Sequence, residues 1–189
     1  PMAHGSYQEL CHDQNIDIVY IASLRPDHKL HAEMALNCGK HVLVEKPMTM
    51  KAEDAQYLYD LGREKQLFVG EGMWTRFFPA VEWTRSLLDV DEERCNDNDD
   101  DDENELKIGN VRVIQADFSI DGDDVGPYPT DSLYATELGG GSARVLLPYI
   151  VGASMLPFNG RLPDRIAANG IVPADVHDVG DVAIGMTMT

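Results

Sequence analysis

One stretch of the sequence decides the fold: ALNCGKHVLVEKP, residues 35–47. Gly39 ends a helical pattern, because glycine readily adopts the left-handed backbone that closes a helix. The apolar, β-branched run at residues 41–44 is typical of a buried strand, and Pro47 ends it. A helix that leads directly into a buried strand indicates one half of a βαβ unit in a parallel sheet.

The same alternation continues on the N-terminal side of this stretch. Residues 17–22, DIVYIA, form a nearly continuous apolar run and predict a strand that is buried on both faces. Pro26 and Asp27 are expected to open the helix between the two strands. Ser6 and Glu9 have the spacing of a capping box, which predicts a short helix before the first strand.

The alternation also continues on the C-terminal side. Thr49 is expected to cap the next helix, and residues 67–70 predict a third strand. Pro79 is expected to open a further helix that reaches about Leu88. Strands and helices thus recur about every 25 residues, which predicts an α/β fold with a partial Rossmann domain over residues 1–88.

The composition changes after residue 88. From Asp89 to Glu105 the chain has eleven acidic residues and one Arg, a net charge of −10 in seventeen residues. Such a run repels itself and has no apolar face to bury, so residues 89–107 are predicted to be a disordered acidic insertion. Calcium binding is the alternative, but an EF-hand loop starting at Asp97 would need Gly at the position of Asp102.

Residues 108–189 follow a different pattern. The partly alternating run at residues 111–118 suits a strand with one exposed face. The glycines at 139–141 favour a tight turn into an apolar helix over residues 145–156. We therefore expect a second unit here, an α+β domain with an open sheet that is incomplete at residue 189.

Net charge and cysteine spacing exclude several classes of protein. The 189 residues carry 33 acidic and 15 basic side chains, a formal charge of −18, which argues against nucleic acid and anionic membranes as partners. Cys11, Cys38 and Cys95 lie far apart, so neither a disulfide framework nor a zinc site is expected. No apolar run approaches the roughly 18 residues of a membrane span and no signal peptide opens the chain, so we expect a cytoplasmic protein.

Three loops are expected to meet where the parallel strands end, because open α/β sheets bind their ligands at that edge. They are residues 23–28, residues 45–47 and residues 71–78, which are richer in polar and aromatic groups than the strands they follow. Lys46, at a strand end, can hydrogen-bond a substrate hydroxyl and assist removal of its proton, and Glu45 can orient it or contact a cofactor. An ordinary exposed Lys at a strand end is the alternative.

Aromatic side chains surround a single cation in WTRFFP, residues 74–79. Such rings can wall a pocket for a ring-shaped ligand, and Arg76 can stack on a ring or bind a phosphate or amide group. A hydrophobic plug between two domains is an equal alternative. His28 and His31 share a helix face, but no third ligand is near them in sequence, so a metal site is not expected.

These segments together resemble the Gfo/Idh/MocA oxidoreductase family, and especially its branch of dimeric dihydrodiol dehydrogenases and NADP-dependent xylose dehydrogenases. The resemblance is strong over residues 5–88 and looser over residues 108–156. The matching segments are residues 17–22, residues 26–28, residues 35–47 and residues 74–79.

The resemblance implies a set of site residues. Lys46 would be the catalytic Lys, and Tyr149, which follows the glycines at 139–141 with the family's spacing, would take up or donate the proton. Val145 stands where the family's pattern has Asp, and Leu147 where it has Gly. The cofactor region would be lined by Ser23, Leu24, Pro26, His28, Glu45, Lys46, Pro47, Trp74 and Arg76.

The resemblance also implies an activity, namely hydride transfer between NADP, or NAD, and a hydroxyl-bearing carbon of a diol or sugar. The complete protein would be a homodimer. The family's first βαβ unit, with its G-x-G-x-x-G turn, does not occur in these residues, so the chain is expected to be an N-terminally truncated fragment. The alternative, favoured by Val145, is a catalytically impaired fragment or a non-catalytic cofactor-sensing or interaction protein on the same scaffold. The sequence leaves open the substrate and the choice between NAD and NADP.

Overall fold

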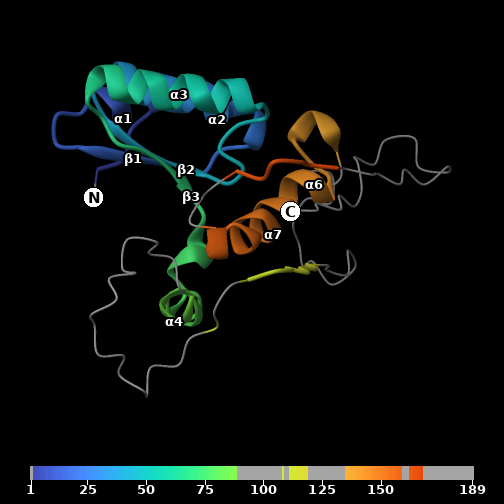
Figure 1. Ribbon diagram of the computed structural model, residues 1–189. Helices are drawn as coiled ribbons and strands as arrows, with labels where there is room; N and C mark the ends of the chain where they lie inside the picture. Colours follow the sequence, from blue (N-terminus) through green and yellow to red (C-terminus); the bar gives the residue numbers. More distant parts are fainter. Residues whose placement is uncertain (1, 89–107, 109–110, 119–134, 159–161, 168–189) are drawn as a thin grey trace, which may run out of the picture.

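The computed structural model describes residues 2–88, 108, 111–118, 135–158 and 162–167, and its N-terminal part is a parallel sheet with helices (Figure 1). The elements of this part are, in chain order, α1 (Tyr7–His12), β1 (Ile18–Ile21), η1 (Arg25–Asp27), α2 (His28–Asn37), β2 (His41–Glu45), α3 (Ala52–Lys65), β3 (Val69–Gly72), η2 (Trp74–Phe77) and α4 (Pro79–Leu87). The described residues after Leu88 form η4 (Thr136–Leu138), α6 (Ser142–Val145), α7 (Leu147–Ser154) and η5 (Leu156–Phe158).

The three strands form one sheet in the order β1-β2-β3, and both pairs are parallel. Helices connect the strands, because parallel neighbours need a crossover connection. Val19 lies opposite Val42 and Ile21 lies opposite Val44 in the register. The carboxyl ends of all three strands therefore lie along one edge of the sheet. The α/β class and the parallel sheet are confirmed.

The core lies between the sheet and helices α2 and α3. Leu36 of α2 and Leu58 of α3 are fully buried and belong to one cluster with Val42 of β2. Complete burial of such a side chain stabilises the fold by about 1.5–3 kcal/mol. Gly62 lets α3 approach β3 closely, because a Cβ there would lie 2.5 Å from Cγ2 of Val69.

The other face of the sheet is not covered by α2 and α3, which lie together on one side (Figure 1). Ile18 and Tyr20 of β1 point to the uncovered face and are 53% and 56% exposed. The prediction that this strand is buried on both faces is therefore wrong for the part of the chain that the structure describes. Alternate side chains of a strand point to opposite faces, and only one face here meets helices.

Several local signals in the sequence are confirmed. The Ser6 hydroxyl caps α1 by accepting a hydrogen bond from the N–H of Glu9 at 3.1 Å. Gly39 has a φ of +77° just after α2, the left-handed backbone that its place at a helix end requires. Pro79 opens α4, which ends at Leu87.

Two local predictions are wrong in detail. The third strand covers residues 69–72 rather than 67–70, because the N–H of Leu67 bonds to the carbonyl of Gly62 and closes α3 instead. Thr49 does not cap α3. Its hydroxyl donates to the carbonyl of Lys51 at 2.7 Å, and Lys51 occupies the N-cap position without a side-chain hydrogen bond.

The described residues after Leu88 confirm a turn and helices but not a strand. Gly139 and Gly141 have φ angles of +76° and +102°, and α6 and α7 follow them. Residues 111–118 have no regular secondary structure, since their backbone has no ladder partner among the described residues. The predicted acidic insertion at residues 89–107 lies outside the described residues, and the domain boundaries stay a prediction. No described helix is both long enough and apolar enough to cross a membrane.

Candidate functional site

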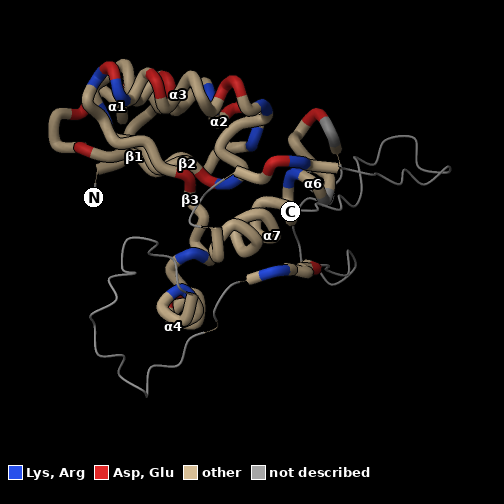
Figure 2. The backbone as a smooth tube through the Cα atoms, in the orientation of Figure 1, with Lys and Arg blue, Asp and Glu red and all other residues tan. Residues whose placement is uncertain are grey.

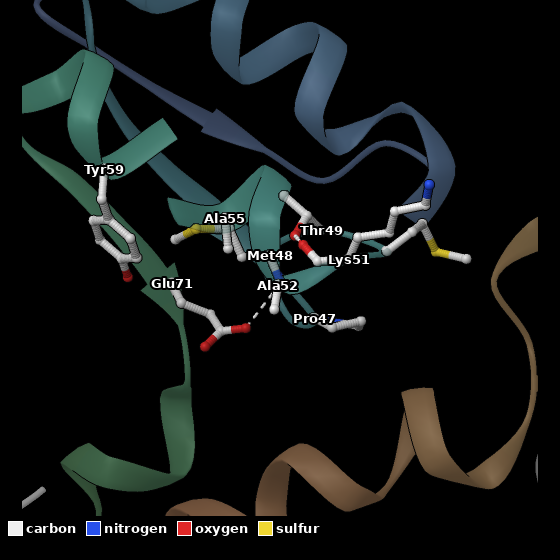
Figure 3. Close-up of a pocket in the computed structure, with 9 residues that line it drawn as sticks. Pro47, Met48, Thr49, Lys51, Ala52, Ala55, Tyr59 and Glu71 are labelled. Atoms are coloured by element: carbon white, nitrogen blue, oxygen red, sulfur yellow. Dashed lines mark hydrogen bonds between the residues drawn. The ribbon is translucent and has the colours of Figure 1, made fainter. Parts of the chain in front are cut away.

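The three loops predicted to carry the site meet at the carboxyl edge of the sheet. His28 is 1% exposed, and its ring nitrogens lie 2.9 Å from the carbonyl oxygen of Pro47 and 3.0 Å from that of Ser23. The ring thus bridges the end of β1 and the loop after β2. The carboxylate of Glu71, on β3, accepts a hydrogen bond of 2.8 Å from the N–H of Met48 (Figure 3).

A cleft of about 240 Å³ lies beside this loop, between the start of α3 and the end of β3 (Figure 3). Met48 and Ala55 supply apolar walls, and Tyr59 and Glu71 supply polar groups. Burial of its ring, followed by the nearby Glu71 charge, raises the pKa of Tyr59. Pro47, one of the predicted cofactor residues, lines this cleft, whereas Lys46 does not, so the cleft borders the predicted site.

Lys46 is half-buried after the end of β2 and contacts the C-terminal helices. Its Nζ donates to the carbonyl of Val145, 99 positions away in the sequence, at 2.7 Å. The same atom lies 4.3 Å from the ring centroid of Tyr149 on α7. Trp74 of η2 donates its indole N–H to the Tyr149 hydroxyl at 3.0 Å. The structure therefore brings Lys46, Trp74 and Tyr149 together.

Four aromatic rings follow one another along this contact. Trp74 meets Phe78 at 5.1 Å and Tyr149 at 6.2 Å between ring centroids, and Phe118 meets Tyr149 at 5.4 Å. All three pairs are edge-to-face, an arrangement that aromatic quadrupoles favour. The indole of Trp74 stays 56% exposed, which leaves a ring surface open to a ligand. Sequence reasoning missed Phe118, because residues 111–118 were expected to form a strand.

Glu45 is held by groups on both sides of it. The hydroxyl of Tyr20 donates to Oε1, and the backbone N–H of Lys46 donates to Oε2 at 3.1 Å. The hydrogen bond to Glu45, more than burial, raises the pKa of Tyr20. Sequence reasoning also missed Tyr20. The only sign of it in the sequence is that alternate residues of the strand DIVYIA face the same side of the sheet, and Tyr20 is one of them.

Basic side chains lie on the segments that meet at this edge, although the whole chain carries a charge of −18 (Figure 2). They are Arg25 on η1, Lys46 after β2, Arg76 on η2 and Arg144 on α6. Burial lowers the pKa of Arg25. The carboxylates of Glu45 and Glu71 lie at the same edge, so basic and acidic side chains are interspersed there.

Three of the residues predicted to line the cofactor region do not take part in the contacts described above. Leu24 is 49% exposed, and Pro26 and Arg76 are exposed as well. His31 does not join His28 in a shared site but bonds to the hydroxyl of Ser23 at 2.8 Å. The described ranges contain no group of three side chains placed to hold a metal ion.

Replacing His28 with Phe is expected to destabilise the chain by about 1–3 kcal/mol, the cost of leaving a buried polar group unpaired. Phe fills the space but offers no N–H to the carbonyls of Ser23 and Pro47. Urea unfolding followed by circular dichroism measures the loss. His12→Phe is the control, because its exposed ring bonds to the carbonyl of Gln8, where water can replace it. Equal losses in both variants would contradict a bridging role for His28.

Comparison with known proteins finds similarity to one oxidoreductase family. Residues 3–73 match the Gfo/Idh/MocA model, described as an oxidoreductase family with an NAD-binding Rossmann fold. The trans-1,2-dihydrobenzene-1,2-diol dehydrogenase of Xenopus tropicalis is 33% identical over 180 residues, which are 95% of this chain and 47% of that protein. The protein of the same name from Sus scrofa is 35% identical over 170 residues, or 90% and 45% of the two chains.

A solved structure supports the fold over most of the chain. The Bacillus subtilis protein yvaA superposes with a TM-score of 0.60 at 19% identity, covering 92% of this chain and 43% of that one. The chain thus spans less than half of the length of the relatives it matches. The segment that matches the family model, residues 3–73, contains all three described strands and the loop that carries Lys46. Residues 3–73 are therefore similar to the NAD-binding Rossmann fold of the Gfo/Idh/MocA oxidoreductase family.

Proposed function

We propose that this chain carries catalytic residues of an NADP-dependent dehydrogenase that oxidises a hydroxyl-bearing carbon of a diol or sugar. The contact of Lys46 and Trp74 with Tyr149 is the observation that carries the proposal. Similarity to the trans-dihydrodiol dehydrogenases supports the substrate class and the nicotinamide cofactor.

The side chains at the carboxyl edge of the sheet fit a nicotinamide nucleotide and a substrate hydroxyl. The exposed indole of Trp74 offers a flat apolar surface to a ring. The Glu45 carboxylate offers acceptors to amide or ribose hydroxyl groups. A nicotinamide held there would supply the acceptor for the hydride of the substrate carbon.

The positions of Tyr149 and Lys46 suit transfer of the proton of the substrate hydroxyl. Trp74 donates to the Tyr149 oxygen, so the phenol's own proton is directed to another acceptor. The Lys46 ammonium beside the ring stabilises negative charge on the phenol. Once its own proton has left, Tyr149 can take the hydroxyl proton during oxidation and return it in the reverse reaction. Lys46 uses one of its three N–H donors on Val145, and the others can hydrogen-bond the substrate oxygen.

Titration of the chain with NADPH and with NADH tests the cofactor. Saturable quenching of tryptophan fluorescence is expected with NADPH, and more weakly with NADH. The chain has two tryptophans, which provide a matched pair of variants. Trp74→Phe should abolish the quenching, whereas Trp83→Phe, on exposed α4, should retain it.

Turnover then separates the two functions that the chain can have. Reduction of NADP⁺ in the presence of a trans-dihydrodiol or a pentose is expected for the dehydrogenase. Saturable binding without turnover of any such substrate would favour a cofactor-sensing protein, the alternative that Val145 supports. A folded chain that binds neither nucleotide would contradict both functions.

A further inference from the structure

Tyr20 lies on the sheet face that α2 and α3 leave uncovered. Its register partner on β2 is Leu43, so Glu45 is the next residue of β2 on the same face. Long side chains reach such diagonal neighbours on an adjacent strand. The phenol of Tyr20 thus meets the Glu45 carboxylate at the edge where the candidate site lies.

The Glu45 carboxylate is held at both of its oxygens. Tyr20 donates its hydroxyl proton to Oε1, and the backbone N–H of Lys46 donates to Oε2. Neither Glu45 nor the Lys46 ammonium forms an ion pair with any other residue that the structure describes. A carboxylate has about four acceptor sites, so the fixed Glu45 can still accept hydrogen bonds from a ligand.

The bond between Tyr20 and Glu45 adds little to folding. Tyr20 is 56% exposed, and water readily replaces either partner of an exposed hydrogen bond. What the bond changes is the rotational freedom of the Glu45 side chain, because a glutamate held at one oxygen only can turn about its own bonds. The contact therefore acts on the geometry of the site.

We propose that Tyr20 is a positioning residue, whose hydroxyl orients the Glu45 carboxylate toward a nicotinamide nucleotide bound beside Lys46. The identity of the ligand rests on the proposed function, whereas the orientation of Glu45 is a property of the chain alone. The chain offers a matched control in Tyr57, which is 41% exposed and donates its hydroxyl to Glu33 at 2.6 Å. This second pair joins α3 to α2 and includes no residue of the loop that carries Lys46.

Carbon-13 NMR of the glutamate carboxyl groups, in the chain without ligand, tests the orientation. Tyr20→Phe is expected to move the Glu45 signal and to leave the Glu33 signal in place. Tyr57→Phe should do the opposite. Signals are assigned by the loss of one resonance in Glu45→Gln and in Glu33→Gln. An unmoved Glu45 signal in Tyr20→Phe overturns the inference, whatever the chain binds.

NADPH titration of the same variants tests the consequence for the ligand. Tyr20→Phe is expected to bind NADPH about fivefold more weakly, the effect of one ordinary hydrogen bond. Tyr57→Phe should bind it as the unchanged chain does. In the Glu45→Ala background, which removes the acceptor of the Tyr20 hydroxyl, Tyr20→Phe should have no further effect, because contacting partners are not additive.

An equal fivefold loss in the Glu45→Ala background would overturn the inference, since Tyr20 would then act without Glu45. Absence of NADPH and NADH binding in the unchanged chain would instead overturn the proposed function and the ligand of this inference with it. The NMR result would still decide whether Tyr20 orients Glu45. The two failures are therefore distinguishable.

Discussion

Replacing Lys46 with methionine is expected to lower the rate of substrate oxidation by about 10²- to 10⁴-fold, the usual contribution of a positioned proton-transfer group. Methionine has a similar length but neither charge nor N–H donors. The variant therefore loses the hydrogen bond to Val145 and the positive charge beside the Tyr149 ring. Initial rates of NADP⁺ reduction with a trans-dihydrodiol measure the effect.

A lysine from the same loop is the matched control for this variant. Lys51 is exposed at the start of α3 and has no side-chain hydrogen bond to another described residue, so Lys51→Met should keep the original rate. NADPH titration of both variants shows whether the loss lies in binding or in the chemical step. An unchanged rate for Lys46→Met would remove Lys46 from the mechanism, even if Tyr149 proved essential.

The elements around Lys46 could be predicted because their signals are local. Gly39 closes α2 and the apolar run at residues 41–44 forms β2, since helix ends and buried strands are each specified by a few neighbouring residues. The sequence also predicted that the three loops meet at one edge, because parallel strands place their carboxyl ends together. This much of the site is encoded in the order of strands and helices.

The contacts within the site could not be predicted in the same way. Tyr20 reaches Glu45 only because β1 and β2 pair with Tyr20 opposite Leu43, and a shift of one residue would send Tyr20 to the other face. The contact of Lys46 with Val145 spans 99 positions and depends on how α6 and α7, which contacts η2, are placed relative to the loop after β2. Family resemblance pointed to Tyr149, but no local pattern did.

Replacing Gly139 with alanine is expected to cost about 1–2 kcal/mol for the left-handed backbone and about 1–3 kcal/mol for overpacking. Gly139 has a φ of +76°, and a Cβ there would lie 2.8 Å from the Cβ of Arg25 and 3.0 Å from the sulfur of Met50. The glycine turn thus packs directly on η1 and on the loop after β2. Urea unfolding followed by circular dichroism measures the loss of stability.

Gly39 provides a control that separates the two costs. Its φ is +77°, nearly the same as at Gly139, but a Cβ there would have nothing within 4 Å. Gly39→Ala should therefore lose only the backbone contribution, about 1–2 kcal/mol. Equal losses in the two variants would show that the turn does not pack against Arg25 and Met50.

Turnover is a second measurement for Gly139→Ala, because the backbone strain and overpacking that the alanine introduces can be relieved in two ways. The whole chain can become less stable, or the turn can move away from Arg25 while the sheet stays folded. Helix α7 follows this turn, so movement of the turn separates Tyr149 from Lys46 in a chain that is still folded. Turnover should fall in Gly139→Ala even where circular dichroism still shows a folded chain, whereas Gly39→Ala should keep its turnover. A folded Gly139→Ala variant with full turnover would mean that the contact between Lys46 and Tyr149 does not depend on the glycine turn.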